Sequence, residues 1–345
     1  MIKLLYPFIR PIAFAVDAEH IHDLTLKWLK RIEKSPLRAF IAETVIDDPV
    51  EIFGITFPNR VGLAAGLDKN GACIDGLASL GFGHIEVGTV TPRPQPGSPK
   101  PRLFRLPKAK GLINRFGFNN LGVDQLIKNV KAAKFSGVLG INISKNFDTP
   151  LDQATNDYLI CLTKVYPYAS YITVNISSPN TANLRDLQFG DALEELLVAI
   201  KEKQVSLTQN HNKKVPILIK IAPDLNDQEL ETLAISLVKH KVDGVIATNT
   251  SFSREAVKGL CHADEQGGLS GAPIFDASTQ VLAKLSTIID GAFPIIAVGG
   301  IDSGTKAVEK IDAGASLVQI YSGFVFEGPD LISRVAKALK KRLEN

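Results

Sequence analysis

Eight short apolar segments recur along the chain after residue 50, and most of them are continuous runs without alternating polar residues. They cover residues 62–65, 84–89, 137–143, 171–176, 216–221, 244–248, 294–298 and 316–320. Continuous apolar runs are typical of parallel strands that are buried on both faces. Amphipathic helical stretches, such as 191–206 and 228–239, separate several of them. This order predicts an α/β fold, a (β/α)8 TIM barrel, with an open doubly wound sheet as the alternative.

The first part of the chain does not follow this rhythm. Residues 51–58 predict a small hairpin at the closed end of the barrel, with Gly54 at its turn. Residues 17–32 predict an amphipathic helix, and an apolar stretch precedes it. We therefore divide the chain into an N-terminal helical extension, residues 1–45, and a barrel, residues 46–345. The extension either packs on the barrel as a helix, or lies on a bilayer or forms a mouth for a lipid-like ligand.

The composition narrows the classes of function. A net charge of +3 does not indicate a nucleic-acid-binding protein. The three cysteines are far apart and form no CxxC pair, and no HExxH motif occurs, so we expect neither a disulfide framework nor a metal site. Because no run of about 20 apolar residues is present, we expect no transmembrane helix.

Polar residues follow the ends of most of the predicted strands. They include Lys69, Thr89, Asn142, Asn175, Lys220 and Asn249. The carboxyl ends of barrel strands form one mouth, which is where TIM-barrel active sites lie. A polar ligand would satisfy this many amides and ammonium groups, although a single Asn at such a place is more often a cap or turn residue. Most arginines of the proline-rich loop at 93–105 are expected to be solvated.

Three of these strand ends carry more specific signals. Ser178 follows a buried strand where it could act as a base, or it could belong to an ordinary turn. Lys220 could form a Schiff base, stabilise negative charge on a reduced cofactor, or reach solvent from the strand end. The glycine-rich stretches 299–304 and 321–323 follow the last two strands, where barrels often bind phosphate.

A set of short motifs spans nearly the whole chain. In order, the motifs are 65–69 (AGLDK), 88–92 (GTVTP), 114–119 (NRFGFN), 175–180 (NISSPN), 220–224 (KIAPD), 248–250 (TNT) and 299–301 (GGI). Together they closely resemble the dihydroorotate dehydrogenase family. The serine at 178, where the cytosolic class has cysteine, and the N-terminal extension resemble the membrane-associated, quinone-dependent class 2.

The resemblance implies a flavoprotein oxidoreductase that contains FMN and oxidises dihydroorotate to orotate in pyrimidine (UMP) biosynthesis. It implies that the general base Ser178 removes the C5 proton while a hydride passes from C6 to flavin N5. The implied substrate-binding residues are Lys69, Asn114, Arg115, Phe116, Gly117, Phe118, Asn175, Asn180, Asn249 and Thr250. The implied FMN-binding residues are Ala65, Gly66, Leu67, Asp68, Lys69, Thr89, Asn142, Asn175, Lys220, Thr248, Gly271, Gly300, Tyr321 and Ser322.

The resemblance also implies how electrons leave the enzyme. A membrane quinone would enter through an apolar mouth formed by the extension, with His22, Arg105 and Tyr321 near its head group. Peripheral contact with membrane lipid, at the cytoplasmic face of the inner cell membrane, is implied as well. The alternatives are a soluble, fumarate-using dihydroorotate dehydrogenase, a non-catalytic membrane-peripheral barrel that binds a phosphate ligand, and a lyase that forms a Schiff base on Lys220.

Overall fold

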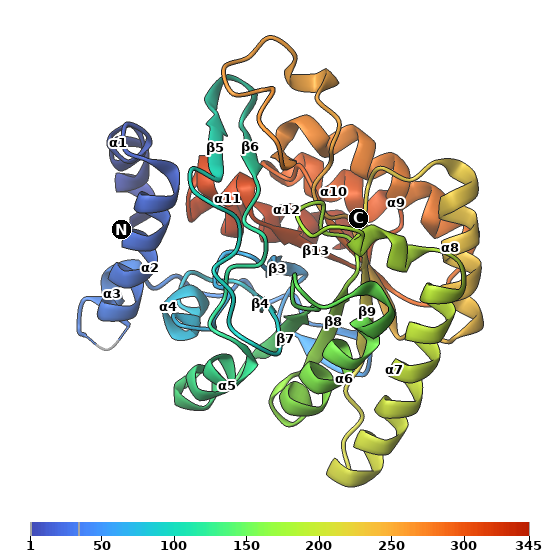
Figure 1. Ribbon diagram of the computed structural model, residues 1–345. Helices are drawn as coiled ribbons and strands as arrows, with labels where there is room; N and C mark the ends of the chain where they lie inside the picture. The colour runs from blue at the N-terminus through green and yellow to red at the C-terminus, as the bar shows by residue number, and fades with distance from the viewer. Residues whose placement is uncertain (1, 34, 345) are drawn as a thin grey trace.

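The computed structural model describes residues 2–33 and 35–344, and its centre is a closed barrel of parallel strands (Figure 1). In chain order the strands are β3 (Val61–Leu63), β4 (His84–Val90), β7 (Val138–Ile143), β8 (Tyr171–Asn175), β9 (Ile217–Ile221), β10 (Gly244–Ala247), β12 (Ile295–Val298) and β13 (Leu317–Ile320). Each strand pairs with the next in this order, and β13 closes on β3, with Gln319 opposite Gly62. All eight predicted strands are present, and the closure confirms the TIM barrel.

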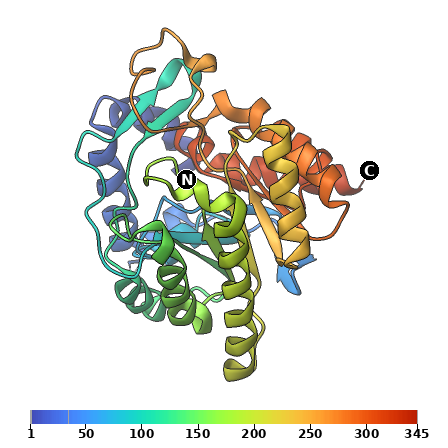
Figure 2. The ribbon, with the colours of Figure 1, turned by 45° about the vertical axis from the view of Figure 1, so that its right-hand side comes forward.

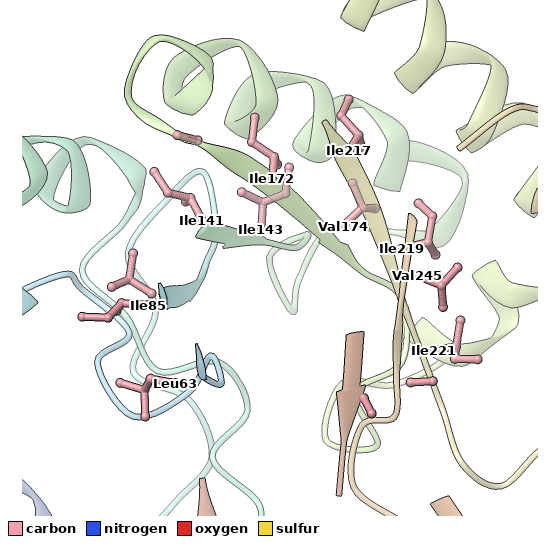
Figure 3. Packing of buried hydrophobic residues seen from close by; sticks show 14 of the residues in the cluster. Leu63, Ile85, Ile141, Ile143, Ile172, Val174, Ile217, Ile219, Ile221 and Val245 are labelled. Atoms are coloured by element: carbon pink, nitrogen blue, oxygen red, sulfur yellow. The ribbon is translucent and has the colours of Figure 1, made fainter. Parts of the chain in front are cut away.

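Helices surround the barrel (Figures 1 and 2). They are α4 (Ile74–Ala78), α5 (Val123–Ala132), α6 (Ala154–Val165), α7 (Gly190–His211), α8 (Asp227–Lys239), α9 (Phe275–Ile289), α10 (Gly304–Asp312), α11 (Ser322–Glu327) and α12 (Asp330–Glu344). Apolar side chains on alternate strand positions, such as Ile141 and Val174, pack in one cluster with the helices (Figure 3). Because side chains alternate along a strand, the positions between them point into the barrel.

A hairpin closes the amino end of the barrel. Strands β1 (Val50–Ile52) and β2 (Ile55–Phe57) are joined through Phe53 and Gly54, whose φ angles of 59° and 73° suit a tight hairpin turn. The fully buried Phe57 packs in a cluster with Val138 and Leu218, which lie at the starts of their strands. The predicted hairpin is confirmed, and it leaves the carboxyl end as the open end of the barrel.

A three-stranded antiparallel sheet stands beside this open end. It consists of β5 (Leu103–Leu106), β6 (Gly111–Asn114) and β11 (Gly268–Gly271), in the order β11-β6-β5 (Figure 1). Phe104, Ile113 and Leu269 form a small apolar cluster with the loops around it. The prediction of a loop at 93–105 is wrong for the start of β5, which pairs with β6, and β6 in turn pairs with β11, more than 150 residues further along the chain.

The N-terminal helices lie together along one side of the barrel (Figures 1 and 2). They are α1 (Ile2–Phe14), α2 (Ala18–Ile32) and α3 (Arg38–Ile41). The Asp17 side chain accepts a hydrogen bond from the backbone N–H of His20 and begins α2, so the predicted helix at 17–32 is confirmed. The Tyr6 hydroxyl donates to the carbonyl of Val325 at 2.5 Å, and Arg10 donates to that of Phe326 at 2.6 Å. These bonds attach α1 to α11.

A buried ion pair attaches α2 to the loop before β5. Arg102 Nη2 lies 2.8 Å from Glu19 Oε1, and both side chains are only 7% exposed. The expectation that most arginines of this loop are solvated is therefore wrong for Arg102, because its partner is 83 positions away. The Arg102 guanidinium lies 5.7 Å from the Phe116 ring centre, and the Lys69 ammonium lies 4.0 Å from the same ring centre. Arg102 therefore links helix α2 to the Phe116 ring, over which the Lys69 ammonium lies.

Candidate active site at the carboxyl end of the barrel

A cavity with about 990 Å³ of empty space, its mouth included, lies at the carboxyl ends of the strands. Its lining includes these sequence-predicted residues: Ala65, Gly66, Lys69, Thr89, Asn114, Phe116, Gly117, Phe118, Asn175, Ser178, Asn180, Lys220, Thr248, Asn249, Thr250, Gly271, Gly300, Tyr321 and Ser322. Residues from distant parts of the sequence therefore meet in one place.

Three predicted cofactor residues lie just outside this lining and support it. Leu67 is part of the apolar core. The Asp68 carboxylate accepts hydrogen bonds from the backbone N–H groups of Ala72 and Cys73, both at 2.8 Å. Asn142 accepts a hydrogen bond of 2.6 Å from the hydroxyl of Thr89, which does line the cavity. Their side chains therefore lie behind the residues that line the cavity.

Three other predicted residues lie further out. Arg115 pairs with Glu265 at 2.7 Å and lines a separate, shallower hollow. His22 lies on α2 with its ring centre 6.5 Å from that of Phe116, and burial together with the Lys69 charge lowers the pKa of His22 to about 3. Arg105 donates to the carbonyls of Phe14 and Val16 at the end of α1. His22 and Arg105 therefore belong to the contact between the extension and the barrel.

Ser178 lies in the loop after β8, buried against the cavity. Its Oγ accepts a hydrogen bond of 3.2 Å from the backbone N–H of Asn180. Arg185 holds this loop, because it donates to the carbonyl of Ser177 at 3.1 Å and to that of Thr250 at 2.9 Å. One guanidinium thus fixes the Ser178 loop relative to the loop after β10.

Four asparagines form two linked pairs around Ser178. Asn180 Nδ2 donates to Asn114 Oδ1 at 3.3 Å, which joins the loop after β8 to the end of β6. Asn249 Nδ2 donates to Asn175 Oδ1 at 3.3 Å, which joins the ends of β10 and β8. Because each amide carries both donors and acceptors, the group can match the alternating carbonyl and N–H groups at the edge of a flat heterocycle.

Two ammonium groups in the cavity have no counterion. In residues 2–33 and 35–344, neither Lys69 nor Lys220 has a hydrogen bond or an ion pair. Burial lowers the pKa of Lys69 to about 8, and the charge of Arg102 adds to this effect. Burial also lowers the pKa of Lys220, while the charge of Glu86 opposes the shift. Because a buried cation without a partner is unfavourable, both groups favour an anionic ligand.

One end of the cavity is walled by glycine backbone. Gly271 and Gly300 have φ angles of 91° and 75°. A Cβ at Gly300 would lie 2.5 Å from Phe275 Cα, and one at Gly271 would lie 2.3 Å from the Lys110 carbonyl oxygen. Both positions therefore require glycine, and their bare backbone suits a phosphate group.

Several lining residues were not predicted from the sequence. They are Ala64, Ser270, Ile274, Val298, Gln319 and Ile320. Gln319 was detectable, because it is a polar residue inside an otherwise apolar strand, 317–320. Ser270 had no such signal, because its place beside Ser322, 2.8 Å between the two hydroxyl oxygens, depends on the unpredicted strand β11.

The outer face of α1 and α2 is apolar. We define it by Leu4, Leu5, Phe8, Ile9, Ile12, Leu24 and Trp28, which are all exposed. Leu4, Phe8 and Ile12 follow a spacing of four residues along α1 and are 72%, 75% and 74% exposed. No helix in the described part of the chain is long and apolar enough to span a membrane.

Comparisons with known proteins agree on one family. The family model described as "Dihydroorotate dehydrogenase" matches residues 49–343. A protein of Paraburkholderia phymatum is 58% identical over 342 residues, 99% of each chain, and one of Cronobacter sakazakii is 58% identical over 336 residues, 97% of this chain and 100% of its own. Both are named "Dihydroorotate dehydrogenase (quinone)". The crystal structure of DHODH in complex with ferulenol from Eimeria tenella superposes with a TM-score of 0.87, at 36% identity, covering 95% of this chain and 92% of that one.

The barrel, its polar mouth and these matches together define an oxidoreductase of the TIM-barrel class. The chain belongs to the dihydroorotate dehydrogenase family. Within that family it falls in the quinone-dependent class 2, as the sequence motifs predicted.

Proposed function

We propose that this protein oxidises dihydroorotate to orotate with FMN as its cofactor and a membrane quinone as the electron acceptor, in the synthesis of pyrimidines. The observation that carries this proposal is the convergence of Ser178, four asparagine amides and two ammonium groups without counterions in one cavity. The family is flavin-dependent, and the proposal specifies FMN as the flavin.

The residues around the cavity fit a flavin mononucleotide. The unpaired Lys220 ammonium would lie against the part of the ring that gains negative charge on reduction. The backbone at Gly271 and Gly300, with Ser322, would receive the phosphate. Held by these residues, the flavin would supply a hydride acceptor for the substrate and an electron donor for the quinone.

Ser178 would remove the proton from C5 of dihydroorotate. A serine hydroxyl is a weak base, so the developing negative charge on its oxygen needs stabilisation. The backbone N–H of Asn180, 3.2 Å from Ser178 Oγ, is placed to supply it. The low exposure of Ser178, 5%, keeps water away from the oxygen during the transfer.

Lys69 and the asparagines would orient the substrate. Lys69 would attract the carboxylate of dihydroorotate, and Asn114, Asn175, Asn180 and Asn249 would hold its amide edges, with Thr250 beside them. Several hydrogen bonds around a flat ring fix both its position and its rotation, so C5 is presented to Ser178.

The quinone would enter beside the extension. The apolar outer face of α1 and α2 suits the surface of a bilayer, at the cytoplasmic face of the inner membrane. Arg105 Nη2 is buried and has no hydrogen-bond partner among the residues that the structure describes, so it could bind a polar quinone head group. His22 and Tyr321 would lie on either side of the path from this surface to the flavin.

A visible spectrum tests the proposal directly. The purified protein is expected to be yellow, to lose flavin absorbance when dihydroorotate is added without oxygen, and to regain it when a quinone analogue follows. A properly folded, colourless protein that cannot take up FMN contradicts the cofactor. A yellow protein that dihydroorotate does not bleach contradicts the substrate.

The pKa of Lys69 predicts how orotate binding depends on pH. Below about pH 8 the ammonium is charged and attracts the orotate carboxylate, so the affinity is expected to be constant. Above that pH the lysine loses its proton and the affinity is expected to fall, approaching about tenfold per pH unit. Titrations of FMN-loaded protein with orotate between pH 6 and 10 measure this. Lys69→Arg stays charged over the range and should remove the fall, whereas a flat wild-type profile would contradict the role of Lys69.

A further inference from the structure

Glu86 is a fully buried carboxylate inside the barrel, and the function described above does not use it. It lies on β4, between Ile85 and Val87, which pack outward against the helices. Three groups from three other strands donate hydrogen bonds to it: Asn142 Nδ2 at 2.8 Å, Gln319 Nε2 at 2.9 Å and the Tyr171 hydroxyl at 3.0 Å. Both carboxylate oxygens of Glu86 therefore act as hydrogen-bond acceptors.

A chain of hydrogen bonds runs from Glu86 towards Ser178. Asn142 Nδ2 donates to Glu86, and Asn142 Oδ1 accepts from the Thr89 hydroxyl at 2.6 Å. Thr89 Oγ1 in turn accepts from Asn175 Nδ2 at 3.1 Å. Asn175 Oδ1 then accepts from the backbone N–H of Ser177, the residue before Ser178, at 3.2 Å. Each of these three side chains thus donates a hydrogen bond on the Glu86 side and accepts one on the side of the loop that carries Ser178.

The direction of this chain is fixed at both ends. A carboxylate can only accept, and a backbone N–H can only donate, so neither end group can reverse its part. If Asn142 turned its amide over, its oxygen would face the Glu86 carboxylate. If Asn175 turned, its NH₂ would face the N–H of Ser177. The two Asn side chains and the Thr89 hydroxyl therefore have one permitted arrangement.

The carboxylate also acts on Lys220. Burial lowers the pKa of that lysine, and the negative charge of Glu86 is the one influence that raises it. Because Lys220 has no hydrogen bond or ion pair in the described residues, Glu86 is the anion that favours its charged form. One buried group thus influences both the amides and the ammonium of the cavity.

We propose that Glu86 is a positioning residue of this enzyme, the fixed acceptor that sets the direction of the hydrogen-bond chain through Asn142, Thr89 and Asn175 to the loop that carries Ser178. The proposal rests on the proposed function for the identity of the ligands. It assigns Glu86 no contact with substrate or cofactor.

Replacing Glu86 by glutamine tests the proposal. The change keeps the size of the side chain, but puts an NH₂ group where three donors need an acceptor. Orotate affinity and the rate of flavin reduction by dihydroorotate are each expected to fall about 10- to 100-fold, as for the loss of one hydrogen bond to a charged group. FMN affinity, measured by quenching of flavin fluorescence, is expected to weaken with them.

A second substitution tests whether the losses in Glu86→Gln come from the direction of the hydrogen bonds or from changed packing. In Glu86→Gln combined with Asn142→Asp, the new carboxylate at 142 accepts from the glutamine on one side and from Thr89 on the other. The hydrogen bonds then run in their original direction, and the barrel again holds one negative charge. Orotate affinity, FMN affinity and the rate of flavin reduction are each expected to be at least tenfold higher than in Glu86→Gln. Asn142→Asp alone, which sets two carboxylates against each other, is expected to be worse than the double variant.

Thr173→Val is the matched control. Thr173 is also buried inside the barrel on β8, and within the described part of the chain its hydroxyl has no hydrogen-bond partner. Its replacement should leave all three measurements unchanged. The proposal is overturned if Glu86→Gln leaves these three measurements unchanged, if Thr173→Val lowers them equally, or if the double variant is no better than Glu86→Gln in any of them. A wild-type protein that binds FMN and is not reduced by dihydroorotate would instead overturn the proposed substrate, and FMN affinity would still test Glu86.

Discussion

Ser178→Ala is expected to slow the reduction of bound flavin by dihydroorotate by about 10²- to 10⁴-fold, which is the usual contribution of a positioned base. The hydroxyl lines the cavity and faces the N–H of Asn180, so its loss removes the proton acceptor while the surrounding loop keeps its bonds through Arg185. Stopped-flow absorbance without oxygen measures the rate. FMN content and orotate affinity of the variant should stay near those of the wild type.

Isotopic substitution supplies the control for this prediction. If loss of the C5 proton limits flavin reduction, dihydroorotate with deuterium at C5 should be oxidised more slowly by the wild-type protein, whichever group is the base. A variant that lacks Ser178 but reduces flavin at the wild-type rate would show that another group is the base.

Charging the outer face of α1 is expected to separate the two half-reactions. The triple variant Leu4→Glu, Phe8→Glu and Ile12→Glu should reduce its flavin with dihydroorotate as the wild type does. Burying each of these side chains fully in an apolar phase is favourable by about 1.5–3 kcal/mol of transfer free energy. Binding of the triple variant to lipid vesicles should therefore be weaker by about 100-fold or more. Turnover with a long-tailed quinone in those vesicles should fall with it, because that acceptor is reached through the bilayer.

Exposed apolar residues elsewhere provide the matched control. Val205 and Ile235 lie on α7 and α8 and are each 57% exposed. Glutamates at these two positions change the charge in the same direction but lie away from the extension. Vesicle sedimentation and quinone turnover should be unaffected by them. Equal loss in both sets of variants, or no loss in the α1 set, would contradict membrane contact through this face.

The sequence carried enough information to predict the barrel and the position of its mouth. Eight apolar runs predicted eight strands, and polar residues at their ends, such as Asn175 and Lys220, do meet in one cavity. These features were accessible because strand burial and strand ends are local properties of the chain. The closure of the sheet was predicted from the number of strands and the family resemblance. The pairing of β13 with β3 confirms it.

The features that were missed depend on contacts between distant residues. Arg102 looks like an ordinary loop arginine until Glu19 is placed beside it. Glu86 and Gln319 interrupt their strands, but an apolar run does not show which positions face the centre of the barrel. Only the closed sheet brings these two residues to one hydrogen bond, across 233 positions of the chain.

Because Glu19 and Arg102 form a buried ion pair, the N-terminal extension is structurally coupled to the barrel. Arg102 also donates to the carbonyls of Pro96 and Ser98, and its guanidinium lies near the Phe116 ring, over which the Lys69 ammonium is placed. Cutting away the first helices would remove the carboxylate partner of Arg102 and expose its guanidinium, which lies near the Phe116 ring, so under the proposed function we expect both half-reactions to be disturbed. A change in the tilt of α2 would, through the same contacts, shift the Phe116 ring and the Lys69 ammonium that lies over it.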